Sequence, residues 1–210
     1  MAKKKASKKA STTASTTAST KASTKPAKKP VGQAPTKPAA PVAPASDAVG
    51  PGVGQPAPAF EMADQSGRVH RLSDYLGRWV VLYFYPRDLT PGCTTEACEF
   101  RDALPSFGEG GEGGAVVLGV STDDAASHDR FRSKHALPFD LLADIGHSVC
   151  EAYGVWREKN MYGRKILGVV RTTFLIDPRG VVARRWDKVK AEGHANEVLH
   201  ALQALRTTGV

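Results

Sequence analysis

The run WVVLYFYP, Trp79 to Pro86, places the strongest constraint on how this chain can fold. It is continuously apolar and aromatic and ends at a proline, which is typical of a central strand buried on both faces. AVVLGVST, Ala115 to Thr122, is a second run of this kind. Because such strands must be covered on both sides, we expect a sheet with helices packed against it.

Helical patterns follow each of these two runs. We predict helices over residues 94–107 and 125–135, a short helix over 147–153, and a closing helix over 192–205. The second helix is preceded by two candidate N-cap residues, Asp123 and Asp124. Hairpins are expected in FEMADQSGRVHRLSDY, which turns at Ser66-Gly67, and between strands 171–177 and 181–187, which flank a Pro-Arg-Gly turn.

The order of these elements indicates the fold class. A hairpin is followed by two strand–helix units, a second hairpin and a final helix. Alternating strands and helices that end in an antiparallel pair give an α/β fold with a mixed β-sheet flanked by helices. The thioredoxin-like fold has this order of elements.

Residues 1–46 differ in composition from the rest of the chain. They contain ten lysines, no acidic residue and no aromatic residue, and are otherwise almost entirely Ala, Ser, Thr and Pro. The formal charge of +8 therefore divides into +10 for this segment and −2 for the remainder. Such a segment has too little apolar surface to offset the entropy of ordering. We predict a disordered lysine-rich tail over 1–46, a linker over 47–58, and one folded domain over 59–210.

Several functions of the tail stay open. Clustered lysines release counterions from phosphate backbones, so the tail could bind nucleic acid or another polyanion without sequence preference. It could also be a solubilising extension. An organelle transit peptide is less favoured, because such peptides use arginine and an apolar stripe.

The compartment is constrained by what the sequence lacks. The chain contains neither an apolar run long enough to span a membrane nor a secretory signal. Its three cysteines are too few for a secreted disulfide framework. We therefore expect a cytoplasmic protein that does not contact a membrane.

Two of the three cysteines lie in the segment YPRDLTPGCTTEAC, Tyr85 to Cys98. The pair Pro91-Gly92 follows the predicted strand and interrupts any earlier helix, so Cys93 should occupy the first turn of the helix that follows. In that turn the unpaired backbone N–H groups and the helix dipole favour a thiolate, which is the nucleophilic form of cysteine. The segment thus indicates a site for thiolate chemistry.

The spacing of the two cysteines argues against other kinds of site. A structural zinc site needs four ligands, commonly in closely spaced Cys pairs, and a thioredoxin-type exchanger needs Cys-x2-Cys. In a regular helix a five-residue step separates Cα atoms by ~8.6 Å, whereas a disulfide needs about 4.4–6.8 Å. Cys93 and Cys98 can share a helix when reduced, but can bond only after its first turns unwind. This favours a pair that cycles, and we expect no metal.

The motif Pro86-x3-Thr90-x2-Cys93 resembles the active-site signature of the peroxiredoxins. The longer FYPRDLTPGCTTEACEFRD, together with GVSTD, FDLLAD and RTTFLID, resembles the Q-type subfamily, also called bacterioferritin comigratory proteins. The resemblance covers roughly residues 53–205 and excludes the tail. It implies a bacterial thiol peroxidase that reduces hydrogen peroxide and organic hydroperoxides, with no metal or organic cofactor.

The resemblance also implies a role for each matching residue. Cys93 would be the peroxidatic cysteine, which attacks the O–O bond and becomes a sulfenic acid, and Cys98 the resolving cysteine, which then forms an intramolecular disulfide with it. The Thr90 hydroxyl would hold the thiolate and the peroxide, Pro86 would shield the thiolate from water, and the Arg171 guanidinium would stabilise the thiolate and polarise the peroxide. Thioredoxin or a similar dithiol would restore the thiols of a monomeric enzyme.

Two other functions remain open at this point: a nucleoid or polyanion-binding protein that acts through the tail, and a general thiol–disulfide oxidoreductase. Cys150 is expected to be a small buried residue, with a back-up resolving thiol as the alternative. Glu96 is expected to interact with the helix dipole in the first turn. Residues 158–165, EKNMYGRK, are expected to form a loop near the site, and none of the six histidines is assigned a role.

Overall fold

The computed structural model describes residues 50–108, 114–161 and 164–208. The predicted tail, and residues 47–49 of the predicted linker, lie outside the described residues. The elements in chain order are β1 (Glu61–Asp64), β2 (Val69–Arg71), the 3-10 helix η1 (Leu72–Tyr75), β3 (Trp79–Phe84), α1 (Pro91–Phe107), β4 (Ala115–Ser121), α2 (Ala125–His135), β5 (Asp140–Ala143), α3 (Ser148–Ala152), β6 (Trp156–Met161), β7 (Arg164–Val169), β8 (Thr172–Ile176), β9 (Val182–Asp187) and α4 (His194–Thr207).

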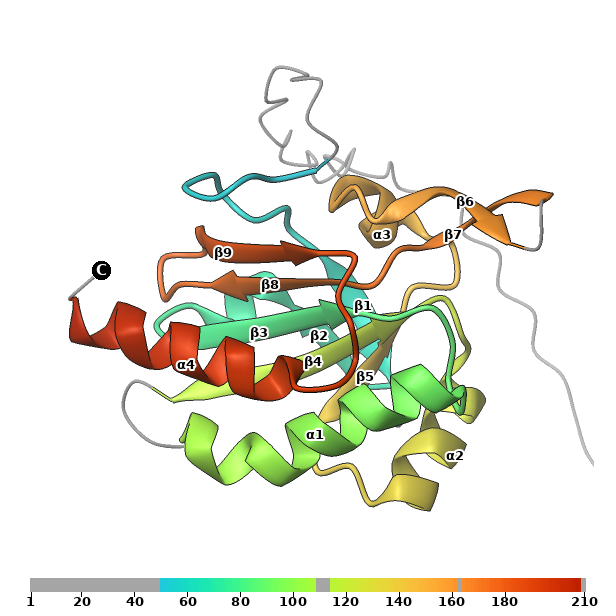
Figure 1. Cartoon of the computed structure of the whole chain (residues 1–210), viewed down its shortest axis with the longest axis horizontal. Helices are drawn as coiled ribbons and strands as arrows, with labels where there is room; N and C mark the ends of the chain where they lie inside the picture. Colours follow the sequence, from blue (N-terminus) through green and yellow to red (C-terminus); the bar gives the residue numbers. More distant parts are fainter. Residues whose placement is uncertain (1–49, 109–113, 162–163, 209–210) are drawn as a thin grey trace, which may run out of the picture. The chain divides into compact units, whose positions relative to one another are not determined.

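Seven strands form one mixed sheet in the order β2-β1-β5-β4-β3-β8-β9 (Figure 1). Strands β3, β4 and β5 are parallel to one another, whereas β1 pairs antiparallel with β5, and β8 pairs antiparallel with both β3 and β9. Every residue of β3 and β4 is buried, as their apolar runs predict. The two runs therefore form the centre of the sheet, and the predicted mixed sheet is confirmed.

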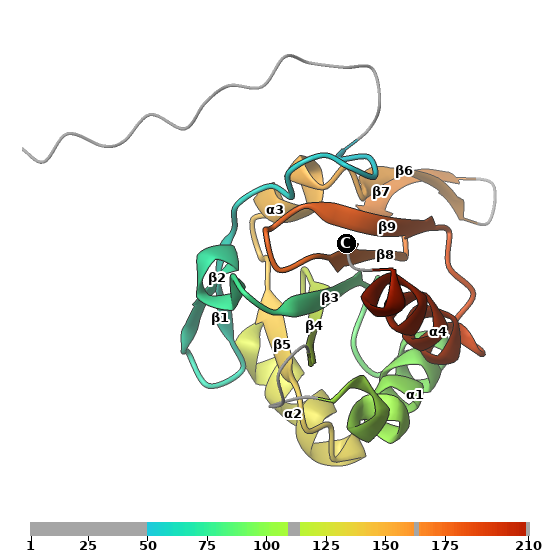
Figure 2. The ribbon, with the colours of Figure 1, turned by 90° about the vertical axis from the view of Figure 1, so that its left-hand side faces the viewer.

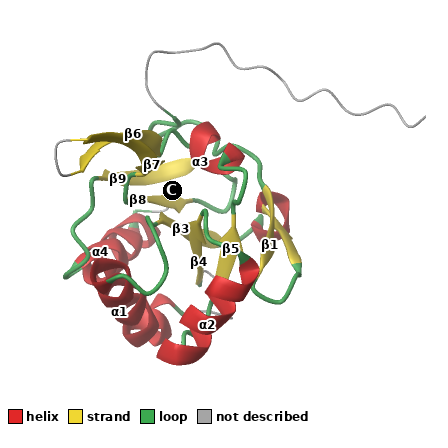
Figure 3. Cartoon of the chain, turned by 90° about the vertical axis from the view of Figure 1, so that its right-hand side faces the viewer, coloured by secondary structure: helices red, strands yellow, loops and turns green. Residues whose placement is uncertain are grey.

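Helices α1, α2 and α4 lie on one side of this sheet, and α3 lies on the other (Figures 2 and 3). Each side has its own hydrophobic core, and α3 packs into the second core together with residues of η1 and β7. Successive side chains of a strand point to opposite faces, so β3 supplies both cores. Its contributions are Trp79, Val81 and Tyr83 to the first core, and Val80, Leu82 and Phe84 to the second.

The predicted helices are present with small shifts of their ends. Helix α2 has the predicted bounds, and its N-cap Asp124 accepts a hydrogen bond from the Ser127 amide at 2.7 Å. Helix α1 begins at Pro91, three residues earlier than predicted, because proline is well suited to the first helical position. Its last residue, Phe107, is followed by the C-cap Gly108, whose left-handed φ of 69° is a common helix termination. Among the described residues, no helix combines the length and apolarity needed to cross a bilayer.

The predicted loop over residues 158–165 is wrong. Strands β6 and β7 pair antiparallel as a separate two-stranded sheet, with Lys159 opposite Ile166. Ile166 and Leu167, adjacent on β7, are 40% and 64% exposed. A hairpin that leaves both faces partly exposed has no alternation of apolar and polar residues, so the usual sign of a strand was missing. The prediction also omits β5, which is too short to show a period.

Residues 50–58 run along the outer edge of β9. The Gly54 amide donates to the Val182 carbonyl at 2.8 Å, and the Val182 amide donates to the Gln55 carbonyl at 2.9 Å. Gly50 has a φ of +84°, and a Cβ there would lie 2.1 Å from the Tyr153 carbonyl oxygen, so only glycine fits. This stretch covers an edge strand that would otherwise expose unpaired backbone groups.

Candidate active site

Cys93 is the third residue of α1, in the first turn of the helix. Thr90 is the N-cap, and the first intrahelical hydrogen bond runs from the Thr94 amide to the Thr90 carbonyl at 2.9 Å. The amides of Gly92 and Cys93 therefore have no acceptor within the helix. The Cys93 side chain is buried, at 1% exposure. A buried sulfur thus lies at the end of α1 where the helix dipole is positive.

Arg171 brings a second positive charge to this sulfur. Its Nη2 donates to Cys93 Sγ at 3.3 Å, while its Nη1 forms an ion pair with Glu96. Gly92 allows this approach, because a Cβ at that position would lie only 3.3 Å from Arg171 Nη2. The Arg171 guanidinium therefore contacts both the Cys93 sulfur and the Glu96 carboxylate.

The strand register explains why Arg171 reaches the start of α1. Strand β8 pairs antiparallel with β3, and Thr172 lies opposite Phe84 at the end of β3. The residue before Thr172 is Arg171, so it lies at the edge of the sheet where the chain leaves β3 and turns into α1. Sequence positions 78 residues apart, 93 and 171, are joined in this way.

Glu96 belongs to the site, and its predicted position in the first turn is wrong. It lies in the second turn of α1, is fully buried, and pairs with Arg171. Burial raises the pKa of Glu96 to about 7, although the charge and hydrogen bond of Arg171 act in the opposite direction; the nearby Glu99 raises the pKa further. The spacing of three residues from Cys93, which places both on one helix face, was the available signal.

Two further residues that the sequence analysis did not select interact with Cys93. Burial lowers the pKa of Lys159 on β6, and the charge of Arg171 lowers it further, whereas Cys93 raises it. Burial raises the pKa of Tyr83 on β3, as do the charges of Glu96 and Cys93. The Tyr83 hydroxyl is buried, and no described residue provides it with a hydrogen bond. The electrostatic surroundings of Cys93 thus extend to Lys159 on β6 and to Tyr83 on β3.

Thr90 and Pro86 lie on the loop between β3 and α1. Thr90 is half-buried, and its hydroxyl donates to the Arg87 carbonyl at 3.0 Å. Pro86 is exposed and follows Tyr85, which is fully buried. The structure thus brings Cys93 and Arg171 into direct contact, while the Thr90 hydroxyl is turned toward the backbone of its own loop.

Cys98 lies five residues further along α1, about one and a half turns, and is partly exposed. Both it and Cys93 are free thiols within one helix, which confirms the prediction that the two can share a helix when reduced. Cys98 Sγ lies 4.0 Å from His135 Nδ1 at the end of α2, and Arg101 also interacts with this thiol. A direct Cys93–Cys98 bond would require α1 to unwind, because the regular helical spacing of ~8.6 Å is too long for a disulfide.

Cys150 is fully buried in α3, as predicted. Burial raises its pKa, and the charge of Asp144 and a hydrogen bond with it raise the pKa further. The thiol is therefore held in its protonated, unreactive form.

One group of possible metal ligands occurs among the described residues. It consists of Asp64, His70 and Asp140, whose ligand atoms lie within 4.8 Å of one another. His70 already bonds both Asp64, at 3.0 Å, and the Tyr75 hydroxyl, and Asp140 accepts from Gln65 at 3.0 Å. These hydrogen bonds join β1, β2 and β5, so the cluster is explained as part of the sheet edge.

Comparison with known proteins agrees with this geometry. The AhpC/TSA family model matches residues 53–185. This chain belongs to the AhpC/TSA family. The peroxiredoxin Bcp of Bacillus subtilis (strain 168) is 48% identical over 151 residues, which cover 72% of this chain and 94% of the relative. The peroxiredoxin Bcp of Escherichia coli (strain K12) is 42% identical over 150 residues, covering 71% of this chain and 94% of the relative.

Solved structures lead to the same subfamily. The bacterioferritin comigratory protein of Xanthomonas campestris, described for its alkyl peroxide reduction activity, matches with a TM-score of 0.65 and 45% identity. The match covers 69% of this chain and 90% of that protein. A PrxQ mutant from Xylella fastidiosa matches with a TM-score of 0.70 and 39% identity, over 74% and 98% of the two chains. The chain is therefore a Q-type, or Bcp-type, peroxiredoxin with a thioredoxin-like fold, and hence a thiol-dependent peroxidase, as the sequence predicts.

Proposed function

We propose that this peroxiredoxin reduces hydrogen peroxide and organic hydroperoxides with the Cys93 thiolate, and that Cys98 resolves the product. The observation that carries the proposal is the 3.3 Å contact between Arg171 Nη2 and Cys93 Sγ. Arginine remains charged at all ordinary pH values, so a permanent positive charge faces this sulfur. The alkyl peroxide reduction described for the Xanthomonas campestris relative supports organic hydroperoxides as substrates.

In the first step the Cys93 sulfur attacks one oxygen of the hydroperoxide and the O–O bond breaks. The sulfur is oxidised to a sulfenic acid, and the other oxygen leaves with the bonding electrons, takes up a proton and departs as water or an alcohol. Arg171 stabilises negative charge on the sulfur and on the leaving oxygen. Thr90 would turn its hydroxyl from the Arg87 carbonyl toward the bound peroxide, and Pro86 would limit access of water to the buried sulfur.

In the second step the Cys98 thiol attacks the sulfenic sulfur of Cys93 and displaces water, which leaves an intramolecular disulfide. The start of α1 must unwind for this bond to form, because Cα atoms five residues apart in a regular helix are too far apart for a disulfide. Thioredoxin or a similar dithiol then reduces the disulfide by thiol–disulfide exchange and is itself oxidised. The partial exposure of Cys98 supports its accessibility to such a partner.

Mass spectrometry after one equivalent of peroxide tests this cycle. The wild-type enzyme should contain a Cys93–Cys98 disulfide and lose helical circular dichroism, because α1 unwinds. Cys98→Ser should still consume one equivalent of peroxide, but should accumulate a sulfenic acid on Cys93 that dimedone captures. Cys150→Ser is the matched control and should retain the Cys93–Cys98 bond. A bond between Cys93 and Cys150, or peroxide consumption without oxidation of Cys93, would contradict the proposal.

We further propose that the enzyme works as a monomer in the bacterial cytoplasm. Both thiols of the cycle lie on one helix, so neither step requires a second subunit. A reducing compartment also supplies the dithiol that the cycle consumes. Light scattering of the reduced and oxidised forms should give the monomer mass, whereas a dimer in either form would contradict this part of the proposal.

The tail supports a second candidate function, binding to nucleic acid or another polyanion. The observation that favours it is the presence of ten lysines and no acidic residue in residues 1–46. Binding to duplex DNA should weaken steeply with salt, because log K falls by about 0.9 per unit of log salt for each phosphate neutralised. Deletion of residues 1–46 should abolish binding and preserve the peroxidase, and Cys93→Ser should do the reverse. Salt-independent binding would contradict this function.

A further inference from the structure

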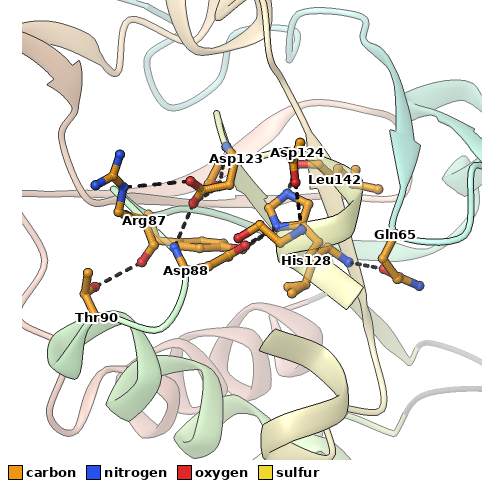
Figure 4. Close-up of polar contacts among 12 residues, drawn as sticks. Gln65, Arg87, Asp88, Thr90, Asp123, Asp124, His128 and Leu142 are labelled. Carbon is orange, nitrogen blue, oxygen red and sulfur yellow. Dashed lines mark hydrogen bonds and ion pairs between the residues drawn. The ribbon is translucent and has the colours of Figure 1, made fainter. Parts of the chain in front are cut away.

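The loop between β3 and α1 carries a buried carboxylate, Asp88, two residues before Thr90. The Asp88 side chain is 2% exposed, and its Oδ1 accepts a hydrogen bond from the Tyr85 hydroxyl at 2.8 Å. Its Oδ2 lies 2.9 Å from His128 Nδ1, and its backbone amide donates to Asp123 Oδ2 at 2.7 Å (Figure 4). The middle of the loop is thus held by two groups outside it, His128 and Asp123, and by Tyr85 at its start.

The imidazole of His128, on α2, faces an acceptor at each of its nitrogens. The ring is fully buried, with Nδ1 toward Asp88 Oδ2 and Nε2 toward the Leu142 carbonyl of β5 at 3.2 Å. A carbonyl oxygen and a carboxylate oxygen can only accept, whereas a neutral imidazole donates from one nitrogen alone. A ring that satisfies both contacts therefore carries a proton on each nitrogen.

Asp88 is the counter-charge for such a ring. Burial would raise its pKa, but the hydrogen bond and charge of His128, together with hydrogen bonds from Ser127 and Tyr85, lower the pKa below its ordinary value. The groups that face the His128 ring are therefore the Asp88 carboxylate and the Tyr85 hydroxyl from the β3–α1 loop, and the Leu142 carbonyl from β5.

The loop itself needs support of this kind. Leu89, between Asp88 and Thr90, has a left-handed φ of 59°, which is unfavourable for a residue other than glycine. Arg87 Nε lies 3.9 Å from Asp123 Oδ1, a long ion pair. The Arg87 carbonyl accepts a hydrogen bond from the Thr90 hydroxyl. Strained conformations persist only where their surroundings hold them, so the anchor at Asp88 determines where Thr90 lies.

We propose that Asp88 and His128 form a buried carboxylate–imidazolium pair that positions the Thr90 loop for reaction with hydroperoxide. The two act through Thr90 rather than on the reacting atoms, so they are positioning residues. The proposal rests on the role proposed above for Thr90. It also assigns a function to one of the histidines that the sequence analysis left without one.

The charge state is tested on the full-length, reduced wild-type enzyme by nuclear magnetic resonance with ¹⁵N-labelled histidine. Both ring nitrogens of His128 should give imidazolium signals at the pH of the peroxidase assay, because both face acceptors. Comparison with His128→Asn assigns the signals. A neutral His128 ring at that pH would overturn the proposal, whether or not Cys93 proves to be the peroxidatic residue.

The positioning role is tested by two reactions of the same sulfur, followed by stopped flow and by alkylation. Asp88→Asn and His128→Asn should each lower the rate of Cys93 oxidation by hydrogen peroxide by about 10- to 100-fold, because small misplacements of a reacting geometry are costly. Alkylation of Cys93 by iodoacetamide, which does not use Thr90, should change by less than about threefold. The double variant should be no slower than the single variants, since each substitution removes the same Asp88–His128 interaction.

His70→Asn is the matched control, because it removes a buried His–Asp pair at the far edge of the sheet, where His70 Nε2 lies 3.0 Å from Asp64 Oδ2. It should leave the rate of peroxide reaction unchanged. An equal loss of peroxide reaction and alkylation in the Asp88 and His128 variants, or an equal loss in the control, would indicate general destabilisation and would overturn the positioning role. Unchanged peroxide reaction in folded variants would overturn it as well.

Discussion

Cys93 and Cys150 occupy the same position in two different helices. Each is the third residue of its helix, α1 or α3, and neither side chain is more than 1% exposed. Their neighbours differ in charge. Arg171 donates to Cys93 Sγ at 3.3 Å, whereas Cys150 lies beside Asp144, whose Oδ2 accepts the Cys150 backbone amide at 2.7 Å.

The difference teaches what makes a buried cysteine reactive in this fold. Burial raises the pKa of Cys150, and the negative charge of Asp144 adds to that effect. Cys93 instead meets a guanidinium, which favours a negative sulfur. Burial and position in the helix are shared by both residues, so the sign of the nearest charge is what separates Cys150 from Cys93, the thiol that we propose to be reactive.

Replacing each sulfur by oxygen should give the largest contrast. Cys93→Ser should lower kcat/KM for hydroperoxide by at least about 10³-fold, because the nucleophile is lost. Cys150→Ser should change kcat/KM by less than about twofold. Steady-state turnover with a thioredoxin system measures both values. A folded Cys150→Ser enzyme without activity would break the comparison.

Removing the charge beside Cys93 should have the next largest effect. Arg171→Met should lower the rate of Cys93 oxidation by about 10²-fold or more, because negative charge in the transition state loses its partner. Arg171→Lys should recover part of this loss, since an ammonium keeps the charge but cannot reach Cys93 and Glu96 with separate donors. Stopped-flow oxidation of the reduced variants gives these rates; equal rates for Met and Lys would mean that charge is not the cause.

Glu96, beside Cys93, should add a pH dependence to the stability of the folded chain between acidic and neutral pH. Burial raises the pKa of Glu96 in the folded chain to about 7, from an ordinary value of 4.5. Between these values the folded state binds more protons than the unfolded state, so the free energy of unfolding should decrease as pH rises. Glu96→Gln should remove this contribution.

Urea unfolding at several pH values across this window, on wild type and Glu96→Gln, measures the contribution as a difference between the two proteins. The difference in the free energy of unfolding between wild type and Glu96→Gln should change progressively between pH 4.5 and about pH 7. A constant difference at all pH values would show that Glu96 does not titrate within it.

The smallest effect is expected for Cys150→Ala. Loss of a sulfur atom from a packed core should lower the free energy of unfolding by about 1 kcal/mol, because neighbouring side chains fill the space only in part. Chemical denaturation measures this value, and kcat/KM should stay at the wild-type level. A stability equal to that of wild type would mean that Cys150 has no packing role.

Much of the fold could be predicted because its signals are local. The continuous apolar runs of β3 and β4 identify central strands, and Asp124 marks the start of α2. The β6–β7 hairpin could not be predicted, because its exposed Ile166 and Leu167 break the alternation that identifies a half-buried strand. Short strands such as β5 show too little pattern to be recognised.

The residues of the site likewise divide into those that are neighbours in the sequence and those that only the fold brings together. Pro86, Thr90 and Cys93 lie within eight residues, so their placement at the start of one helix follows from the motif. The partners of the site lie far away in the chain: Arg171 and Glu96 are 75 residues apart, and Asp88 and His128 are 40 residues apart. A pattern of neighbouring residues carries no information on such pairs, and only the family resemblance selected Arg171.

By itself, the sequence determined the central strands, the helices that follow them and the place of Cys93 in the first turn of a helix, because these outcomes depend on residues a few positions apart. Which charge each buried sulfur meets was decided by the tertiary structure. Electrostatic interactions depend on distance in space rather than along the chain, and the antiparallel pairing of β8 with β3 is what brings Arg171 to Cys93.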